Sequence, residues 1–187
     1  MRNQVTALAL VALLSAPALA AEVAGVKVPD SITVDGKALR LNGAGVRKKF
    51  IVKVYVGALY LESASADPAA IVAADAAKSV HMVFLRDVDK EKIMGAFRDG
   101  FEANGGEAAA KALAPRLDKV GAVVPAEIKE GQELVVTYLP GKGTTVSVSG
   151  GGQATVEGKD FADAMFRNWL GEEPADRGLK ERMLGKE

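Results

Sequence analysis

The stretch from Val46 to Leu61 constrains the fold most strongly, because its residues alternate as a β-strand requires. One parity is mostly apolar, and we expect it to face a core: Phe50, Val52, Val54, Val56, Ala58 and Tyr60. The other parity is mixed: Lys49, Ile51, Lys53, Tyr55, Gly57, Leu59 and Leu61. An unbroken strand of this length is unusual, so we predict a bend or bulge near its start, after Gly43-Ala44-Gly45.

The remaining elements follow from the same periodicity and from turn residues. Further strands are predicted over 26–29, 31–34, 38–42, 79–87, 132–139, 144–149 and 154–157. Helices are predicted over 68–77, from an N-cap at Asp89 to the Asn104-Gly105-Gly106 break, and over 108–120, 160–170 and 174–184. This order predicts an α+β fold with a mainly antiparallel sheet covered on one face by helices.

Composition removes several classes of site. The chain has no cysteine, which excludes disulfides, thiolate catalysis and zinc–cysteine sites. His81 is the only histidine, which excludes a multi-histidine metal site. The 24 basic and 24 acidic residues balance, so bulk charge gives the chain no affinity for nucleic acid. Gly141-Lys142-Gly143-Thr144 lacks the spacing of a phosphate-binding loop, and we expect no cofactor.

The first twenty residues have the three regions of a secretory signal peptide. A short positive start is followed by an apolar run from Val5 to Leu14, and Ala18-Leu19-Ala20 has the small-x-small pattern of a cleavage site. We therefore predict a signal peptide over residues 1–20 and a single domain over 21–187. Export indicates a periplasmic location, and no later stretch is apolar enough to insert into a membrane.

Three segments and the C-terminal order resemble the chalcone-isomerase-like family. The segments are 41–47 (Leu-Asn-Gly-Ala-Gly-Val-Arg), 54–62 (Val-Tyr-Val-Gly-Ala-Leu-Tyr-Leu-Glu) and 84–88 (Phe-Leu-Arg-Asp-Val). The C-terminal part matches in its Pro-Gly hairpin, its Gly-rich turn and a helix ending in Trp169-Leu170-Gly171. The resemblance covers roughly Val26 to Leu184 and implies an open-faced β-sandwich, in which a large antiparallel sheet packs against a layer of helices.

The same resemblance implies an apolar cleft between sheet and helices. In the family's isomerases and fatty-acid binders, an arginine on the Gly-rich strand pairs with an anionic ligand group, and Arg47 matches that arginine. A guanidinium is suited to this task because it offers a rigid two-pronged donor to a carboxylate or phenolate. A ligand-facing Arg47 is weighed against a plain surface arginine, and the resemblance favours the former.

The chain departs from the plant isomerases at their other catalytic positions. Alignment places Asp89 at the catalytic tyrosine, Ala96 at the asparagine, Tyr55 at a threonine and Asn168 at a small hydroxyl residue. Chalcone cyclisation needs a donor to the ketone oxygen, whereas an aspartate at neutral pH is an acceptor. These departures argue against chalcone isomerase activity.

Arg47 and Tyr55 are the candidate catalytic residues, and Arg47, Tyr55 and Asn168 are the candidate ligand-binding residues. On one straight strand, the eight residues from Arg47 to Tyr55 would span about 26 Å. The two side chains therefore share a site only if the chain bends back between Gly45 and Phe50. Otherwise, Tyr55 packs in the core.

Three further features have a plain and a functional interpretation. Lys48, Lys49 and Lys53 are either solvated strand ends or a cluster that attracts an anionic ligand. Arg86-Asp87 is expected to form a local ion pair or to cap the following helix. His81 is expected to be a tolerated strand residue, because nothing near it in sequence completes a catalytic set.

Three functional hypotheses follow. The first is an exported protein that binds a small amphipathic acid, such as a fatty or phenolic acid, at Arg47. The second is a cofactor-independent isomerase or lyase that uses Arg47 and Tyr55. The third is a structural or partner-binding envelope protein whose cleft is filled by its own side chains. An apolar pocket continuous with Arg47 favours the first two over the third.

Overall fold

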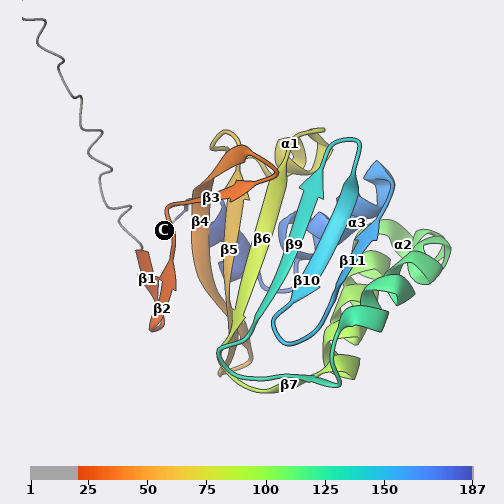
Figure 1. Cartoon of the computed structure of the whole chain (residues 1–187). Coiled ribbons are helices and arrows are strands. Elements are labelled where there is room, and N and C mark those ends of the chain that lie inside the picture. The colour runs from red at the N-terminus through yellow and green to blue at the C-terminus, as the bar shows by residue number, and fades with distance from the viewer. Residues whose placement is uncertain (1–20, 187) are drawn as a thin grey trace, which may run out of the picture.

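A seven-stranded antiparallel sheet forms the centre of the structure, a computed structural model that describes residues 21–186 (Figure 1). The strand order is β11-β10-β9-β6-β5-β4-β3. These strands are β3 (Ser31–Val34), β4 (Lys37–Lys49), β5 (Val52–Leu61), β6 (Lys78–Phe84), β9 (Glu133–Leu139), β10 (Gly143–Val148) and β11 (Gln153–Val156). The predicted signal peptide lies outside the described residues.

Helices cover one face of this sheet (Figure 1). They are α1 (Pro68–Ala73), α2 (Lys90–Val123), α3 (Lys159–Leu170) and α4 (Arg177–Met183). Two small ribbons complete the fold: β1 (Ala21–Val23) pairs with β2 (Val26–Val28), and β7 (Val88–Asp89) pairs with β8 (Glu127–Ile128). This arrangement confirms the predicted α+β fold, with a large antiparallel sheet packed by a layer of helices. No helix within residues 21–186 has the length and apolar character needed to traverse a bilayer.

The segment from Val46 to Leu61, predicted as a strand with a bend or bulge near its start, is divided between two strands. The chain reverses at Phe50-Ile51, so that β4 and β5 form a hairpin with Lys49 opposite Val52. Register shifts follow Leu41 and Arg47, and the first of them lies beside the expected Gly-rich segment. The reversal brings Arg47 directly opposite Tyr55 on the ladder.

Both faces of β5 are buried, contrary to the expected division into a core face and a mixed face. Tyr55, Leu59 and Leu61 belong to the main core beneath the helices. Val56, Ala58 and Tyr60 belong to a smaller cluster on the opposite face, where they are joined by residues of β2, β4 and the segment before β6. Sequence alternation identifies two faces but does not identify which face the helices cover.

Glycines allow α4 to lie against β4. A Cβ at Gly43 would overlap the backbone carbonyl oxygen of Arg182, and a Cβ at Gly45 would come within 2.6 Å of the Arg182 side chain. The Gly-Ala-Gly segment therefore provides close helix–strand contact, in addition to the irregular pairing expected of it.

The helix boundaries agree with the predictions in most places. Gly106 has φ 80° and ψ 164°, which divides α2 into the two helical pieces expected around Asn104-Gly105-Gly106. Helix α1 ends at Ala73, earlier than expected, after beginning at the N-cap Asp67. Asp89 occupies the predicted N-cap position of α2 but makes no side-chain capping bond, because its carboxylate pairs with Lys92.

Candidate functional site

A cavity of about 820 Å³ lies between the sheet and the helices. Its walls come from the hairpin end of β4 and β5, from β6, from the first piece of α2 and from the end of α3. Apolar side chains form much of the wall, including Val54, Phe84, Ile93, Phe97 and Trp169. Small-molecule sites usually have volumes of about 300–1,000 Å³ and mainly apolar walls with a few polar groups, and this cavity meets both criteria.

Arg47 lines the cavity from β4, and one nitrogen of its guanidinium lacks a hydrogen-bond partner. Its Nε is buried and has no hydrogen-bond partner among residues 21–186, and no carboxylate in that range forms an ion pair with it. The guanidinium carbon lies 5.6 Å from the centroid of the Tyr55 ring, which provides a cation–π contact but no acceptor. Leaving a buried charged donor unpaired is costly, so this site favours an anionic acceptor from outside the chain.

Tyr55 lines the same cavity from the paired position on β5. Its hydroxyl accepts a hydrogen bond of 2.9 Å from Nε1 of Trp169, which fixes the ring between sheet and helix. Burial raises the pKa of Tyr55, although the charge of Arg47 opposes the increase. The hydroxyl therefore keeps its proton, and within residues 21–186 that proton is donated to no acceptor.

Asn168 lines the cavity from α3, and its side-chain amide is hydrogen-bonded within its own helix. Its Nδ2 donates to the carbonyl oxygens of Ala164 and Met165, at 3.2 and 2.9 Å. Its Oδ1 lies against Gly100 of α2, where a Cβ would overlap it. In this geometry Asn168 packs α3 against α2, and its Nδ2 is not free to donate to a ligand.

Both basic and acidic side chains line the cavity. Arg47, Lys49, Arg86 and Lys92 contribute positive charge, and Asp87, Asp99 and Glu173 contribute negative charge. Asp87 accepts hydrogen bonds from Lys129 and from the backbone N–H of Glu130, so the expected local pair with Arg86 or cap on α2 does not form. Within the described residues, Arg47, Lys49 and Arg86 make no ion pair.

Sequence reasoning missed two members of this wall as functional candidates. Trp169 was named only as part of the family's C-terminal segment, but its bond to Tyr55 joins helices and sheet at the site. Arg86 was expected to pair locally, whereas it faces the cavity. Arg86 continues the alternation of Val80, Met82 and Phe84 on β6, and this pattern could have predicted its position in the cavity wall.

A family model described as chalcone isomerase-like matches residues 20–185. The chain belongs to the chalcone isomerase-like family. A crystal structure of a fatty-acid binding protein from Arabidopsis thaliana has the same fold, with a TM-score of 0.67 at 17% sequence identity. The alignment covers 86% of this chain and 92% of the plant chain. A search of curated protein sequences found no match.

Neither Asp89 nor Ala96, which align with the catalytic tyrosine and asparagine of the plant isomerases, provides a hydrogen-bond donor in the cavity. Asp89 is half-exposed, and its hydrogen bond with Lys92 holds the pKa of that carboxyl below its usual range. It is absent from the cavity wall, so it supplies no donor there. Ala96 lines the cavity and offers no polar group. His81 lies on the opposite face of the sheet and pairs with Glu133 at 2.7 Å.

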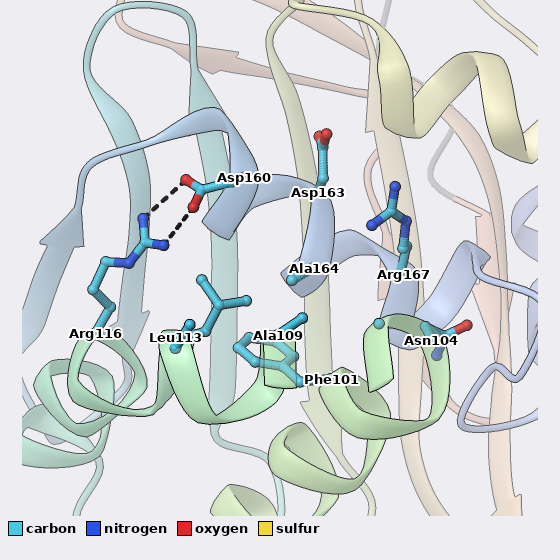
Figure 2. A pocket seen from close by; sticks show the side chains of 11 residues that line it. Phe101, Asn104, Ala109, Leu113, Arg116, Asp160, Asp163, Ala164 and Arg167 are labelled. Carbon is cyan, nitrogen blue, oxygen red and sulfur yellow. Dashed lines mark hydrogen bonds and ion pairs between the residues drawn. The ribbon is translucent and has the colours of Figure 1, made fainter. Parts of the chain in front are cut away.

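A second, smaller cavity of about 330 Å³ lies between α2 and α3 (Figure 2). Arg116 forms a forked pair with Asp160 at its edge, with N–O distances of 2.9 and 2.5 Å. Asp163, on the same helix as Asp160, pairs with Lys159. Arg167 also lines this cavity, but it is exposed to solvent. Because the other charges are paired and Arg167 is solvated, the larger cavity, with the buried and unpaired Nε of Arg47, is the better candidate for a ligand site.

Proposed function

We propose that this chalcone isomerase-like protein binds a small amphipathic acid, with its carboxylate or phenolate at Arg47 and its apolar part in the cavity. The unpaired Nε of Arg47 beside an apolar cavity of about 820 Å³ carries this proposal. A fatty acid or a phenolic acid satisfies both features, because its charged group pairs with the guanidinium while its apolar part displaces water from the wall. An open cavity of this size also argues against a cleft filled by the protein's own side chains.

Native mass spectrometry of the protein purified from producing cells, beside Arg47→Ala, tests the proposal. We expect a small acid to accompany the parent protein and to be missing from the variant. Titration with the fluorescent fatty acid cis-parinaric acid and with p-coumaric acid then gives affinities. Loss of a charge-assisted hydrogen bond is worth about 1.5–3 kcal/mol, so Arg47→Ala should weaken binding roughly 10- to 150-fold.

An exposed arginine provides the matched control. Arg40 is exposed on the same strand, lines neither cavity and forms no ion pair within residues 21–186, so Arg40→Ala removes the same charge while leaving the cavity arginine in place. We expect its affinity to equal that of the parent. If the parent is empty and takes up neither acid on soaking, the proposed role of Arg47 is wrong, and a structural or partner-binding function becomes the better hypothesis.

The free hydroxyl proton of Tyr55 favours a second candidate function, a cofactor-independent isomerase or lyase. Arg47 would stabilise a developing anion, and Tyr55, whose raised pKa keeps it protonated, would act as the acid. Incubating the acid identified by mass spectrometry with parent and Tyr55→Phe distinguishes the two functions. A product formed only by the parent supports an enzyme, and unchanged compound in both supports a binding protein.

We also propose that the chain is exported to the periplasm and cleaved after Ala20. The supporting observation is the arrangement of the positive, apolar and small-residue regions in residues 1–20. The intact mass of the purified protein measures this directly. A chain that begins at Ala21 and is recovered in the periplasmic fraction is expected, whereas an uncleaved cytoplasmic chain would contradict the proposal.

A further inference from the structure

The turn between β4 and β5 exposes two large apolar side chains side by side. Phe50 is 91% exposed and Ile51 is 94% exposed, and the adjoining Val52 is 38% exposed. Single apolar residues on a surface are common, but adjacent ones at the tip of a projecting hairpin form a wedge that water solvates poorly. We define the hairpin tip as residues 48–53.

Lysines surround these apolar side chains. Lys48, Lys49 and Lys53 are exposed, and none of them forms an ion pair within residues 21–186. Some lysines elsewhere pair with carboxylates, such as Lys142 with Asp35 at 2.7 Å. The neutral charge of the whole chain therefore conceals a local positive cluster around an apolar tip.

The hairpin tip breaks two rules of local stability. Lys48 and Lys53 lie directly opposite each other on the ladder, where like charges are destabilising. Phe50 has φ 58°, a left-handed conformation that a bulky residue rarely adopts and that glycine or asparagine would adopt more readily. Residues that disagree with their local structure in this way are expected at functional sites.

We propose that the hairpin tip docks on an anionic lipid surface. Phe50 and Ile51 enter the interface between headgroups and acyl chains, and the three lysines contact the anionic headgroups around them. Apolar side chains bordered by lysines are the chemistry that interfacial anchors use, and each lysine near an anionic surface strengthens binding about fivefold. The docking is peripheral and reversible, since only a short turn enters the interface.

Docking places the mouth of the cavity at the lipid surface. Lys49, Phe50 and Val52 of the tip belong to the cavity wall. An amphipathic acid can then pass between the bilayer and the cavity without crossing water. This consequence rests on the proposed function, whereas docking itself requires only the tip.

Sedimentation with vesicles tests the docking. The purified protein should bind vesicles of phosphatidylcholine with phosphatidylglycerol at least tenfold more tightly than vesicles of phosphatidylcholine alone. The pair Phe50→Ser and Ile51→Ser should weaken that binding tenfold or more, and so should Lys48→Glu with Lys49→Glu. Lys111→Glu with Lys119→Glu is the matched control, because these exposed lysines lie on the second piece of α2, which packs near β10 and β11. The control should bind nearly as tightly as the parent.

A tryptophan at the tip reports insertion without altering the charge. Trp169 of the parent is 2% exposed, so its fluorescence should not respond to lipids that carry bromine on their acyl chains. Ile51→Trp should show additional fluorescence that brominated phosphatidylglycerol vesicles quench. Absence of quenching, or equal binding of parent and tip variants to vesicles, would overturn the proposal. Self-association that depends on Phe50 and Ile51 without vesicle binding would also overturn it, in favour of contact between two copies.

Failure of docking and failure of ligand binding give different results. Arg47→Ala should bind vesicles like the parent, because Arg47 lies inside the cavity. Ile51→Ser with Lys48→Glu changes only tip residues that do not line the cavity, so this variant should keep its affinity for dissolved cis-parinaric acid but take it from vesicles at least several times more slowly. If that transfer is unchanged while docking is lost, the acid reaches the cavity through water, and the inferred route is wrong.

Discussion

At the residue scale, two basic side chains on the helix-covered side of the sheet differ in their hydrogen-bond partners. Lys78 is 1% exposed, and its ammonium group donates to the carbonyl oxygens of Ile71, Val72 and Ala74 at 2.7–3.0 Å. It thereby satisfies the carbonyls at the end of α1. Arg47 has a buried Nε with no such partner within the described residues. A cation whose donors are hydrogen-bonded within the fold is structural. A cation with an unpaired buried donor beside a cavity indicates a ligand-binding site.

Replacing Lys78 should therefore reduce stability without affecting ligand binding. Lys78→Met keeps the volume of the side chain but leaves carbonyls at the end of α1 without their donor, so we expect a loss of about 2 kcal/mol in the free energy of unfolding. Urea unfolding measures it. Lys142→Met, at an exposed pair, should change stability by less than about 0.5 kcal/mol. Equal stability of the two variants would show that the carbonyls of α1 find other partners.

At the element scale, α4 fixes the end of the β4–β5 hairpin that carries the site. The N-cap residue of α4, Asp176, accepts hydrogen bonds from Leu179 of its own helix and from the backbone N–H of Lys48, at 2.9 and 2.8 Å. The same helix lies over Gly43 and Gly45 further along β4. The glycines of β4 thus determine where α4 lies, and α4 in turn helps to hold the strand segment that presents Arg47.

Adding a methyl group at Gly43 tests this contact. The new Cβ would overlap the carbonyl oxygen of Arg182, which is backbone and cannot rotate away, so Gly43→Ala should destabilise the fold by about 2 kcal/mol or more. Gly95→Ala is the matched control, since Gly95 is inside α2 with no atom within 4 Å of its added Cβ. It should stabilise the protein by about 0.5–1 kcal/mol. Shifts of the melting temperature in opposite directions for the two variants would support the contact. An unchanged melting temperature for Gly43→Ala would contradict it.

At the scale of the whole molecule, the three tyrosines join separate layers of the structure. Tyr60 reaches Pro29 on the side of the sheet away from the helices, Tyr138 reaches Asp75 after α1, and Tyr55 reaches Trp169 on α3. Burial raises the pKa of Tyr60 and of Tyr138 to about 12, and it also raises the pKa of Tyr55. The folded protein therefore holds three phenolic protons more tightly than the unfolded chain does.

Stability should consequently decline in alkaline solution. Between pH 10 and 12 the unfolded chain loses tyrosine protons that the folded protein retains, so unfolding is favoured as pH rises, by up to about 1.4 kcal/mol per pH unit for each group.

Lys78 has the opposite effect on the pH dependence of stability. Burial lowers its pKa to about 8, so stability increases between about pH 8 and 10.5, because the folded protein releases that proton first. Lys78→Met should remove this increase. Urea unfolding at several pH values measures the tyrosine and Lys78 effects. If the tyrosines ionise near pH 10, as seen by tyrosinate absorbance, while the circular dichroism spectrum stays native, the tyrosine prediction is wrong.

Sequence alone determined the fold class and most element boundaries. Periodicity and turn residues placed the strands and helices, because each of these signals acts within a few neighbouring residues. The break of α2 at Gly106 is such a case. The family resemblance, carried by short segments around Arg47, Tyr55 and Trp169, named the residues that the structure brings to one cavity.

Tertiary structure decided the rest. The strand alternation from Val46 to Leu61 continues through Phe50 and Ile51, and neither is a turn residue, so the reversal that pairs Arg47 with Tyr55 was hidden. Which face of β5 meets the helices, the bond from Trp169 to Tyr55 and the lack of a partner for Arg47 depend on residues distant in sequence. Local propensity determines which elements form, whereas side-chain compensation depends on where packing places elements that are far apart in the chain.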